Sequence, residues 1–187
     1  MRTLAITQNA TLDGAVEMLT DWFDPQGQGR GDRTDVAEAN RKQSERSDAL
    51  LLGRRTFLDF RGYWPAQREH DTTGVSEELD RIQKYVVSST LDDPGWQHST
   101  VLTGDPVAEA QRLKEQPGRD IVCTGSITLS HALLAGGVVD EVRLWTHPAV
   151  QGRGRRLFPD GFERDRLELR ECRAFRSGIV LTTYAVG

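Results

Sequence analysis

The chain has 187 residues and a formal net charge of −4, and 37% of its residues are hydrophobic and 28% are charged. These values are typical of one globular domain, large enough to bury about 70% of the surface that its unfolded chain exposes. The net negative charge argues against nonspecific nucleic-acid binding, which needs a basic field across a whole face.

The apolar segments are all too short to cross a bilayer, and the N-terminus lacks a signal-peptide pattern. The sequence also shows no repeat, low-complexity tract or composition shift that would mark a domain boundary. We therefore expect a cytoplasmic protein with a single domain over residues 1–187, and no membrane or nucleic-acid partner.

The cysteines and histidines indicate no metal or redox centre. Cys123 lies in an apolar segment and Cys172 lies near the C-terminus, and neither belongs to a C-x-x-C motif. The four histidines are scattered, without the spacing of metal ligands. We expect two reduced, packed thiols and no metal site.

The first part of the chain predicts a strand, a long loop and a helix. Residues 2–7 alternate as in a strand. Residues 8–33 are rich in Gly and Asp and leave room for a short helix over Ala15–Trp22, and their length suggests a mobile lid or an unrecognised element. Thr34 is predicted to cap a largely exposed helix that ends near Arg46, with Asp35 in its first turn.

From residue 49 onward, strand patterns alternate with helix patterns. Strands are predicted at residues 49–52, 84–87, 100–102, 120–123 and 141–147. Helices are predicted at residues 55–60, 76–83, 106–116 and 126–135, with a loop through Tyr63-Trp64-Pro65. Residues 167–175 and 179–186 indicate a terminal antiparallel hairpin. The order predicts an α/β domain with a mostly parallel central sheet, flanking helices and a C-terminal antiparallel hairpin.

Three of these apolar strands end at small polar turns. The turns are Gly53-Arg54-Arg55-Thr56, Ser88-Ser89-Thr90 and Thr124-Gly125-Ser126. Ligands of open α/β sheets bind at the carboxyl edge, where helix N-termini suit phosphates, so the chain is predicted to bind a phosphate-bearing nucleotide. Each turn alone is equally compatible with a solvated structural turn. Neither a Walker motif nor a Rossmann fingerprint is present, because Gly27 and Gly29 do not follow a strand.

Six motifs occur in a defined order along nearly the whole chain. They are TLDG at residues 11–14, LLGRRTF at 51–57, KYVVSS at 84–89, TGS with later leucines at 124–134, VDEVRL at 139–144, and PAVQGRG leading to LF at 148–158. Together they resemble the dihydrofolate reductase-like fold. The resemblance is closest to the reductase domain of bacterial bifunctional riboflavin-biosynthesis deaminase–reductases and its small stand-alone relatives.

The resemblance implies NADPH as cofactor. It places the 2′-phosphate and diphosphate at Gly53, Arg54, Arg55 and Thr56. The adenosine end would lie near Ser88 and Ser89. The diphosphate would also meet the helix start at Thr124, Gly125, Ser126 and Ile127. The nicotinamide would be covered by Leu12, Asp13 and Gly14. A homodimer, formed through the edge of the C-terminal hairpin, is also implied.

The resemblance to dihydrofolate reductases also implies a carboxylate at the start of the first helix that contacts the heterocycle, and the candidate here is chosen by its rough distance before Gly53. Asp35 is the nearest candidate, with Glu38 and Asp24 behind it, and the alternative for Asp35 is a helix-capping acid that complements the helix dipole. The resemblance also directs Thr146 toward the site.

Two further groups of residues leave alternatives open. Trp22-Phe23 and Tyr63-Trp64 are either aromatic walls for a flat heterocycle or ordinary packing. The basic run Gly152-Arg153-Gly154-Arg155-Arg156 either binds a substrate phosphate or forms a basic surface loop.

These observations favour an NADPH-dependent reductase that transfers a hydride to a small flat nitrogen heterocycle. The substrate would be a 5-amino-6-(5-phosphoribosylamino)uracil-type riboflavin precursor or a pterin or dihydrofolate-like ring. No zinc deaminase motif accompanies it. The alternative is a catalytically silent nucleotide- or ligand-binding protein with the same fold. A purely structural domain would bind no nucleotide, and the Gly53–Thr56 turn argues against it.

Overall fold

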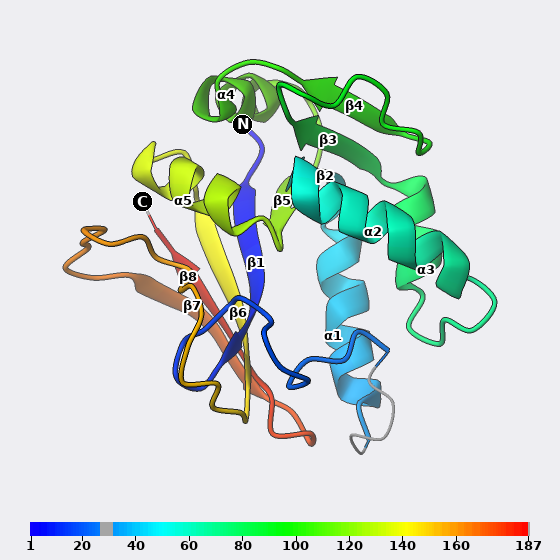
Figure 1. Ribbon diagram of the computed structural model, residues 1–187. Coiled ribbons are helices and arrows are strands. Elements are labelled where there is room, and N and C mark those ends of the chain that lie inside the picture. The colour runs from blue at the N-terminus through cyan, green and yellow to red at the C-terminus, as the bar shows by residue number, and fades with distance from the viewer. Residues whose placement is uncertain (27–31, 187) are drawn as a thin grey trace.

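The computed structural model describes residues 1–26 and 32–186, and these residues form one mixed sheet with helices on both faces (Figure 1). In chain order the elements are β1 (Leu4–Thr11), α1 (Thr34–Glu45), β2 (Ser47–Gly53), α2 (Arg54–Gln67), α3 (Val75–Arg81), β3 (Gln83–Val87), β4 (Ser99–Leu102), α4 (Pro106–Glu115), β5 (Asp120–Thr124), α5 (Ile127–Ala135), β6 (Glu141–His147), β7 (Glu168–Ala174) and β8 (Val180–Ala185).

The sheet has the order β4-β3-β2-β5-β1-β6-β8-β7 within the described residues. The strands from β4 to β6 in this order are parallel, whereas β8 is antiparallel to β6 and β7 is antiparallel to β8. The predicted α/β fold with a C-terminal antiparallel hairpin is therefore confirmed. The parallel arrangement also brings the ends of β2 and β5, which are neighbours, to one edge of the sheet.

Successive residues of the central strands pack against opposite layers of helices. Leu51 and Cys123 belong to a core with α4 and α5, while Leu50 and Val122 belong to a core with α2 and α3. This alternation follows from the two-residue period of a strand. Because both faces are covered, the middle of β2 (residues 49–52) and of β5 (residues 121–123) is a continuous apolar run without a polar face.

Helix α1 lies near the hairpin on the same face of the sheet as α2 and α3, and it contacts the sheet through a narrow apolar stripe. Val36 and Ala39 are its buried residues, and they pack against Trp145, Phe175 and Ile179. The rest of α1 is largely exposed, as its small apolar residues predicted. This core is separate from the core under α2 and α3, so a gap remains between α1 and those helices.

Three local predictions were wrong. No helix forms over residues 15–22, and the loop predicted at 63–65 belongs to α2, which runs to Gln67 with Pro65 inside it and with Trp64 buried in the core. Thr34 is the first helical residue rather than the cap, and it donates its backbone N–H to Asp32 at 3.0 Å. Gly27 and Gly29 lie outside the described residues, as does part of the predicted lid.

No helix in the described part of the chain combines the length and hydropathy that a bilayer span requires. The two cysteines differ, and the prediction that both are packed was wrong for one of them. Cys123 is completely buried in β5, whereas Cys172 is exposed on β7.

This difference predicts selective thiol alkylation. Burial raises the pKa of the Cys123 thiol to about 12, and only the thiolate is nucleophilic. Iodoacetamide at neutral pH should therefore modify one thiol in the native protein and two in denaturant, measured by mass spectrometry. A Cys172→Ser variant should stay unmodified until it unfolds, and rapid native labelling of this variant would contradict the buried position of Cys123.

Candidate functional site

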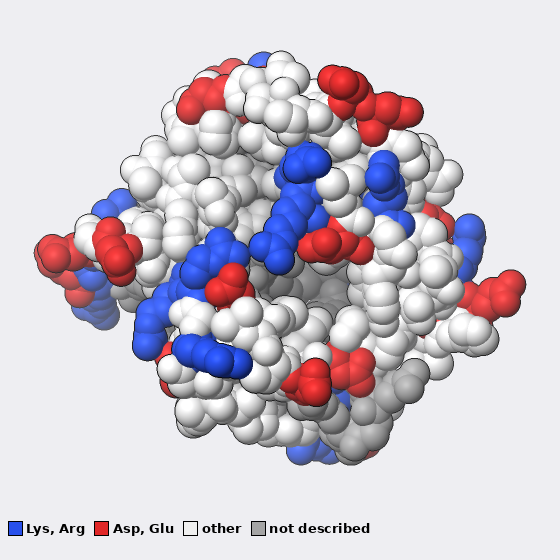
Figure 2. Space-filling view, in the orientation of Figure 1, with Lys and Arg blue, Asp and Glu red and all other residues white. Residues whose placement is uncertain are grey.

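The main cavity opens at the carboxyl edge of the parallel strands and has a volume of about 770 Å³. It is enclosed by α2, by the start of α5, and by residues 16–25, which follow β1. Figure 2 shows it as a hollow on this face, with several Lys or Arg side chains and some acidic ones on its rim. Its position and size suit a ligand of dinucleotide size.

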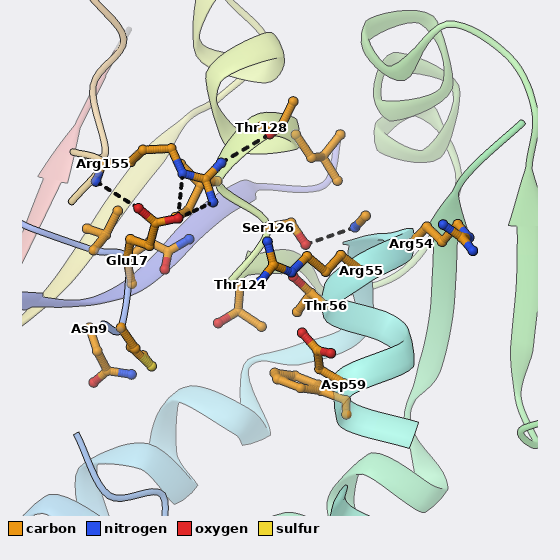
Figure 3. Close-up of a pocket in the computed structure, with 18 of the residues that line it drawn as sticks. Asn9, Glu17, Arg54, Arg55, Thr56, Asp59, Thr124, Ser126, Thr128 and Arg155 are labelled. Carbon is orange, nitrogen blue, oxygen red and sulfur yellow. Dashed lines mark hydrogen bonds and ion pairs between the residues drawn. The ribbon is translucent and has the colours of Figure 1, made fainter. Parts of the chain in front are cut away.

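The start of α2 brings two arginines to the cavity. Gly53 precedes the helix, and Arg54 and Arg55 occupy its first turn, which holds no acidic residue and no capping side chain. In Figure 3, Arg55 points toward Ser126 and Thr124, whereas Arg54 points away on the other side of the helix. One helix start therefore offers guanidinium groups in two directions.

The opposite wall begins with the turn that leads from β5 into α5. Ser126 Oγ accepts a hydrogen bond from the Gly53 backbone N–H at 2.8 Å, so this side chain does not cap α5. Gly125 has φ +66°, and a Cβ there would lie 2.9 Å from Thr56 Cγ2. A glycine is required here by both its backbone conformation and the close approach of α2.

The helix starts at this cavity differ from the other helix starts in the described residues. Helices α1, α3 and α4 each carry an acidic residue in the first turn, and Asp105 caps α4. Helices α2 and α5 have neither feature. The starts of both helices, which no side chain caps, and their positive dipole ends face the cavity, which is the arrangement that binds phosphate.

The wall formed by residues 16–25 is held by the distant side chain of Gln151. Its Oε1 accepts hydrogen bonds from the Leu19 N–H at 3.0 Å and from Trp22 Nε1 at 2.9 Å, and its Nε2 donates to the Glu17 carbonyl at 2.9 Å. Asp13 in turn accepts the backbone N–H groups of Gln151 and Gly152 at 3.1 and 2.8 Å. Hydrogen bonds from the Thr11 hydroxyl and from these N–H groups lower the pKa of Asp13 to about 2.

An ion pair crosses the upper part of this wall. Arg155 Nε donates to Glu17 Oε1 at 3.0 Å, and its Nη1 lies 3.5 Å from the hydroxyl of Thr128 in the first turn of α5 (Figure 3). Hydrogen bonds from Arg155 lower the pKa of Glu17. The basic loop at residues 152–156 therefore reaches into the cavity instead of facing only solvent.

A smaller cavity of about 260 Å³ lies between α1 and the α2–α3 pair. The residues that line both cavities are Asn9, Phe23, Pro25, Phe60, Trp64 and Thr124. His147 lies 2.9 Å from Asn9 Oδ1 through its Nε2, and its ring packs edge-on against Trp22 and Phe23. Burial raises the pKa of Glu78, another residue of the smaller cavity. The place where the two cavities meet is thus lined by three aromatic rings and by the polar side chains of Asn9 and Thr124.

Most of the predicted cofactor residues meet at the main cavity. Those that line it are Gly53, Arg54, Arg55, Thr56, Thr124, Gly125, Ser126 and Ile127. The others do not: Leu12 is exposed, Asp13 and Gly14 lie in the turn beneath the wall, the Ser88 hydroxyl accepts the N–H groups of Thr90 and Leu91, and Ser89 is exposed.

The structure does not bring Asp35 to either cavity. Its carboxylate accepts the Arg176 backbone N–H at 3.0 Å, and this bond lowers its pKa, as does the nearby guanidinium. Glu38 pairs with Lys42 on the exposed side of α1, whereas Asp24 lines the smaller cavity. Thr146 lines neither cavity. Of the aromatic pairs, Phe23, Tyr63 and Trp64 line the main cavity.

Four residues that the sequence did not single out, or left undecided, also line the main cavity: Asn9, Glu17, Asp59 and Arg155. Asp59 could have been found from its spacing, because it lies one helical turn after Arg55 and therefore on the same side of α2. The pairing of Glu17 with Arg155 spans 138 residues, and no local pattern encodes it. In the described residues, no group of three or more His, Cys, Asp or Glu side chains could hold a metal ion.

The fold and the cavity define an α/β protein of the dihydrofolate reductase-like type with a dinucleotide-sized site. Residues 2–181 match the family described as the RibD C-terminal domain, and the chain belongs to this family of NAD(P)H-dependent pyrimidine reductases. It is 34% identical over 141 residues to the uncharacterized protein YyaP of Bacillus subtilis strain 168, with 73% of each chain covered. It is 24% identical over 175 residues to YwjB of the same strain, also uncharacterized, with 91% covered.

Solved structures support the fold. A pyrimidine reductase-like protein of Corynebacterium diphtheriae superposes with a TM-score of 0.65 at 14% identity, covering 100% of this chain and 92% of the other. A Thermotoga maritima diaminohydroxyphosphoribosylaminopyrimidine deaminase/5-amino-6-(5-phosphoribosylamino)uracil reductase gives a TM-score of 0.65 at 15% identity. This chain covers 57% of that longer protein.

The bond between Ser126 and Gly53 predicts a stability effect. In a Ser126→Ala variant the partly buried Gly53 N–H loses its acceptor, which should lower the free energy of unfolding by about 1–3 kcal/mol. Urea denaturation measures this change. A Ser89→Ala variant is the matched control, because Ser89 is exposed, and its effect should stay within about 0.5 kcal/mol. Equal effects of the two variants would contradict the role of this bond.

Proposed function

We propose that the protein is an NADPH-dependent reductase that transfers a hydride to a small flat nitrogen heterocycle. The observation that carries this proposal is the convergence of two uncapped helix starts, α2 and α5, on one cavity with two arginines. Such a convergence serves a diphosphate better than any neutral ligand. Membership in a family of NAD(P)H-dependent pyrimidine reductases supports the same reading.

The residues present fit the cofactor. Gly125 leaves room for close approach of a diphosphate, and Arg55 and Thr56 supply donors beside it. Arg54, which points away from the diphosphate position, is placed to bind the 2′-phosphate that distinguishes NADPH from NADH. When bound, the nicotinamide supplies the hydride. The protein orients the reactants and excludes water from the reacting atoms.

The heterocycle would occupy the junction of the two cavities. Phe23, Phe60 and Trp64 provide flat apolar surface there, and Asn9 and Thr124 provide polar groups. With its Oδ1 bonded to His147, Asn9 can present its amide N–H groups to the ring. A uracil-type ring fits this donor set, and the Thermotoga relative is named for reduction of such a ring. A pterin-like ring is the second candidate.

A catalytically silent binding protein is the alternative, and the position of Asp35 favours it, because the acid predicted from the sequence is absent from both cavities. The two functions differ in one assay. A reductase oxidises NADPH when the heterocycle is supplied, whereas a binding protein binds NADPH without turnover.

Cofactor binding is the first prediction of this function. Calorimetric titration should show tighter binding of NADPH than of NADH, since only NADPH engages Arg54 through a 2′-phosphate. An Arg54→Ala, Thr56→Ala double variant should bind NADPH at least about tenfold more weakly, because it loses charge-assisted hydrogen bonds. Failure of the wild-type protein to bind either nucleotide would refute the proposed function.

Asp59 generates a second prediction, concerning the substrate. It lies between the arginines and the aromatic residues of α2, and no described residue binds its carboxylate. We expect it to accept a ring N–H, so an Asp59→Asn variant should lose about tenfold in kcat/KM for the heterocycle. Steady-state kinetics with NADPH at saturation measure this loss. Asp92→Asn, an exposed change outside both cavities, is the control.

We also propose that the protein is a homodimer formed through β7. This strand is one of the two edges of the sheet in the described residues, and it is exposed almost throughout, with Leu169 52% exposed. Such an edge pairs readily with a second strand. Light scattering during gel filtration should give twice the monomer mass, and a Leu169→Lys variant should shift the protein toward the monomer. A wild-type monomer would exclude this assembly.

A further inference from the structure

The Glu17 carboxylate contacts Arg155 in the way that a bound anionic ligand would. Arg155 contacts the carboxylate through Nε at 3.0 Å and Nη2 at 2.9 Å, both to Oε1, and its backbone N–H donates to Oε2 at 3.2 Å. This guanidinium grips a carboxylate as it would grip a phosphate. Both side chains retain solvent contact, with 45% of Arg155 and 27% of Glu17 exposed, so the pair is weak enough to exchange partners.

The surroundings of this pair belong to the phosphate end of the cavity. Arg155 Nη1 also reaches the hydroxyl of Thr128, in the first turn of α5. The Arg55 guanidinium, on the opposite wall, contributes to lowering the pKa of Glu17. Glu17 thus carries a negative charge between two cavity arginines, and within the described residues neither arginine forms an ion pair with any other carboxylate (Figure 3).

On the basis of the proposed function, we propose that Arg155 is a further phosphate-binding residue and that Glu17 forms an ion pair with it in the ligand-free protein. A diphosphate bound at the start of α5 would take the Arg155 guanidinium from Glu17. Two anions cannot share this position without strong repulsion, so Glu17 and the diphosphate compete for one cation. The internal carboxylate therefore lowers the affinity for every ligand that carries a diphosphate.

A double-mutant cycle tests this exchange. NADPH binding is measured by calorimetry for the wild-type protein, Glu17→Gln, Arg155→Gln and the double variant, with inorganic pyrophosphate as a second probe. Glu17→Gln should tighten binding about two- to fivefold, and Arg155→Gln should weaken it about tenfold. In the Arg155→Gln background, Glu17→Gln should have almost no effect, because no guanidinium remains to be released. Arg155→Lys, which retains the charge, should restore part of the affinity.

The outcomes separate this proposal from the proposed function. If Glu17→Gln tightens binding equally in both backgrounds, Glu17 acts only through its charge and the exchange is refuted. If the wild-type protein binds NADPH and Glu17→Gln binds it with the same affinity, the exchange is refuted while the proposed function stands. If none of the four proteins binds NADPH, both fail.

A matched pair controls for the loss of any surface ion pair. Glu109 and Arg112 form a similar pair on α4, in which Arg112 Nε and Nη2 donate to Glu109 Oε2 at 3.0 and 2.7 Å, and neither residue lines a cavity. Glu109→Gln and Arg112→Gln should leave NADPH affinity unchanged within twofold. Comparable changes in these variants would show that the effects at Glu17 and Arg155 are not specific to the cavity.

Discussion

One hydrogen bond, from the Gly53 backbone N–H to Ser126 Oγ at 2.8 Å, joins the two turns on which the site depends. It connects the end of β2 with the end of β5, which are adjacent strands. It also uses the hydroxyl that would otherwise be available to cap α5. The same contact therefore fixes the distance between two helix starts and leaves one of them, that of α5, without a side-chain cap.

The two sides of the cavity are built by different means. The side formed by α2 and α5 continues directly from buried parallel strands, so its geometry follows from the sheet. The side formed by residues 16–25 has no regular secondary structure, and its position depends on Gln151, on Asp13 and on the pairing of Glu17 with Arg155. The side formed by α2 and α5 is therefore supported by the sheet, whereas the wall facing it depends on side chains from a distant loop.

The sequence predicted the strands along the chain and the meeting of the Gly53–Thr56 and Thr124–Ile127 turns at one cavity, because buried apolar strands followed by Gly, Arg, Thr or Ser turns are local patterns. It did not predict the opposite wall, where residues 15–22 satisfy their polar groups with Gln151 instead of forming a helix. Asp35 was misplaced for a related reason: its position in the first turn was predicted, but Arg176, 141 residues away, determines which way it faces. Contacts across such separations leave no periodic signal.

The dependence of the wall on Gln151 has a consequence for its local stability. A segment held by a few hydrogen bonds to one side chain opens at a lower free energy than a strand inside a sheet. The amide hydrogen of Leu19, bonded to Gln151 Oε1, should exchange with solvent faster than that of Ile6, thirteen residues earlier, because Ile6 lies in β1, which pairs with strands on both sides. The protein thus combines, within its first 25 residues, a strand inside the sheet with a wall that side chains hold in place.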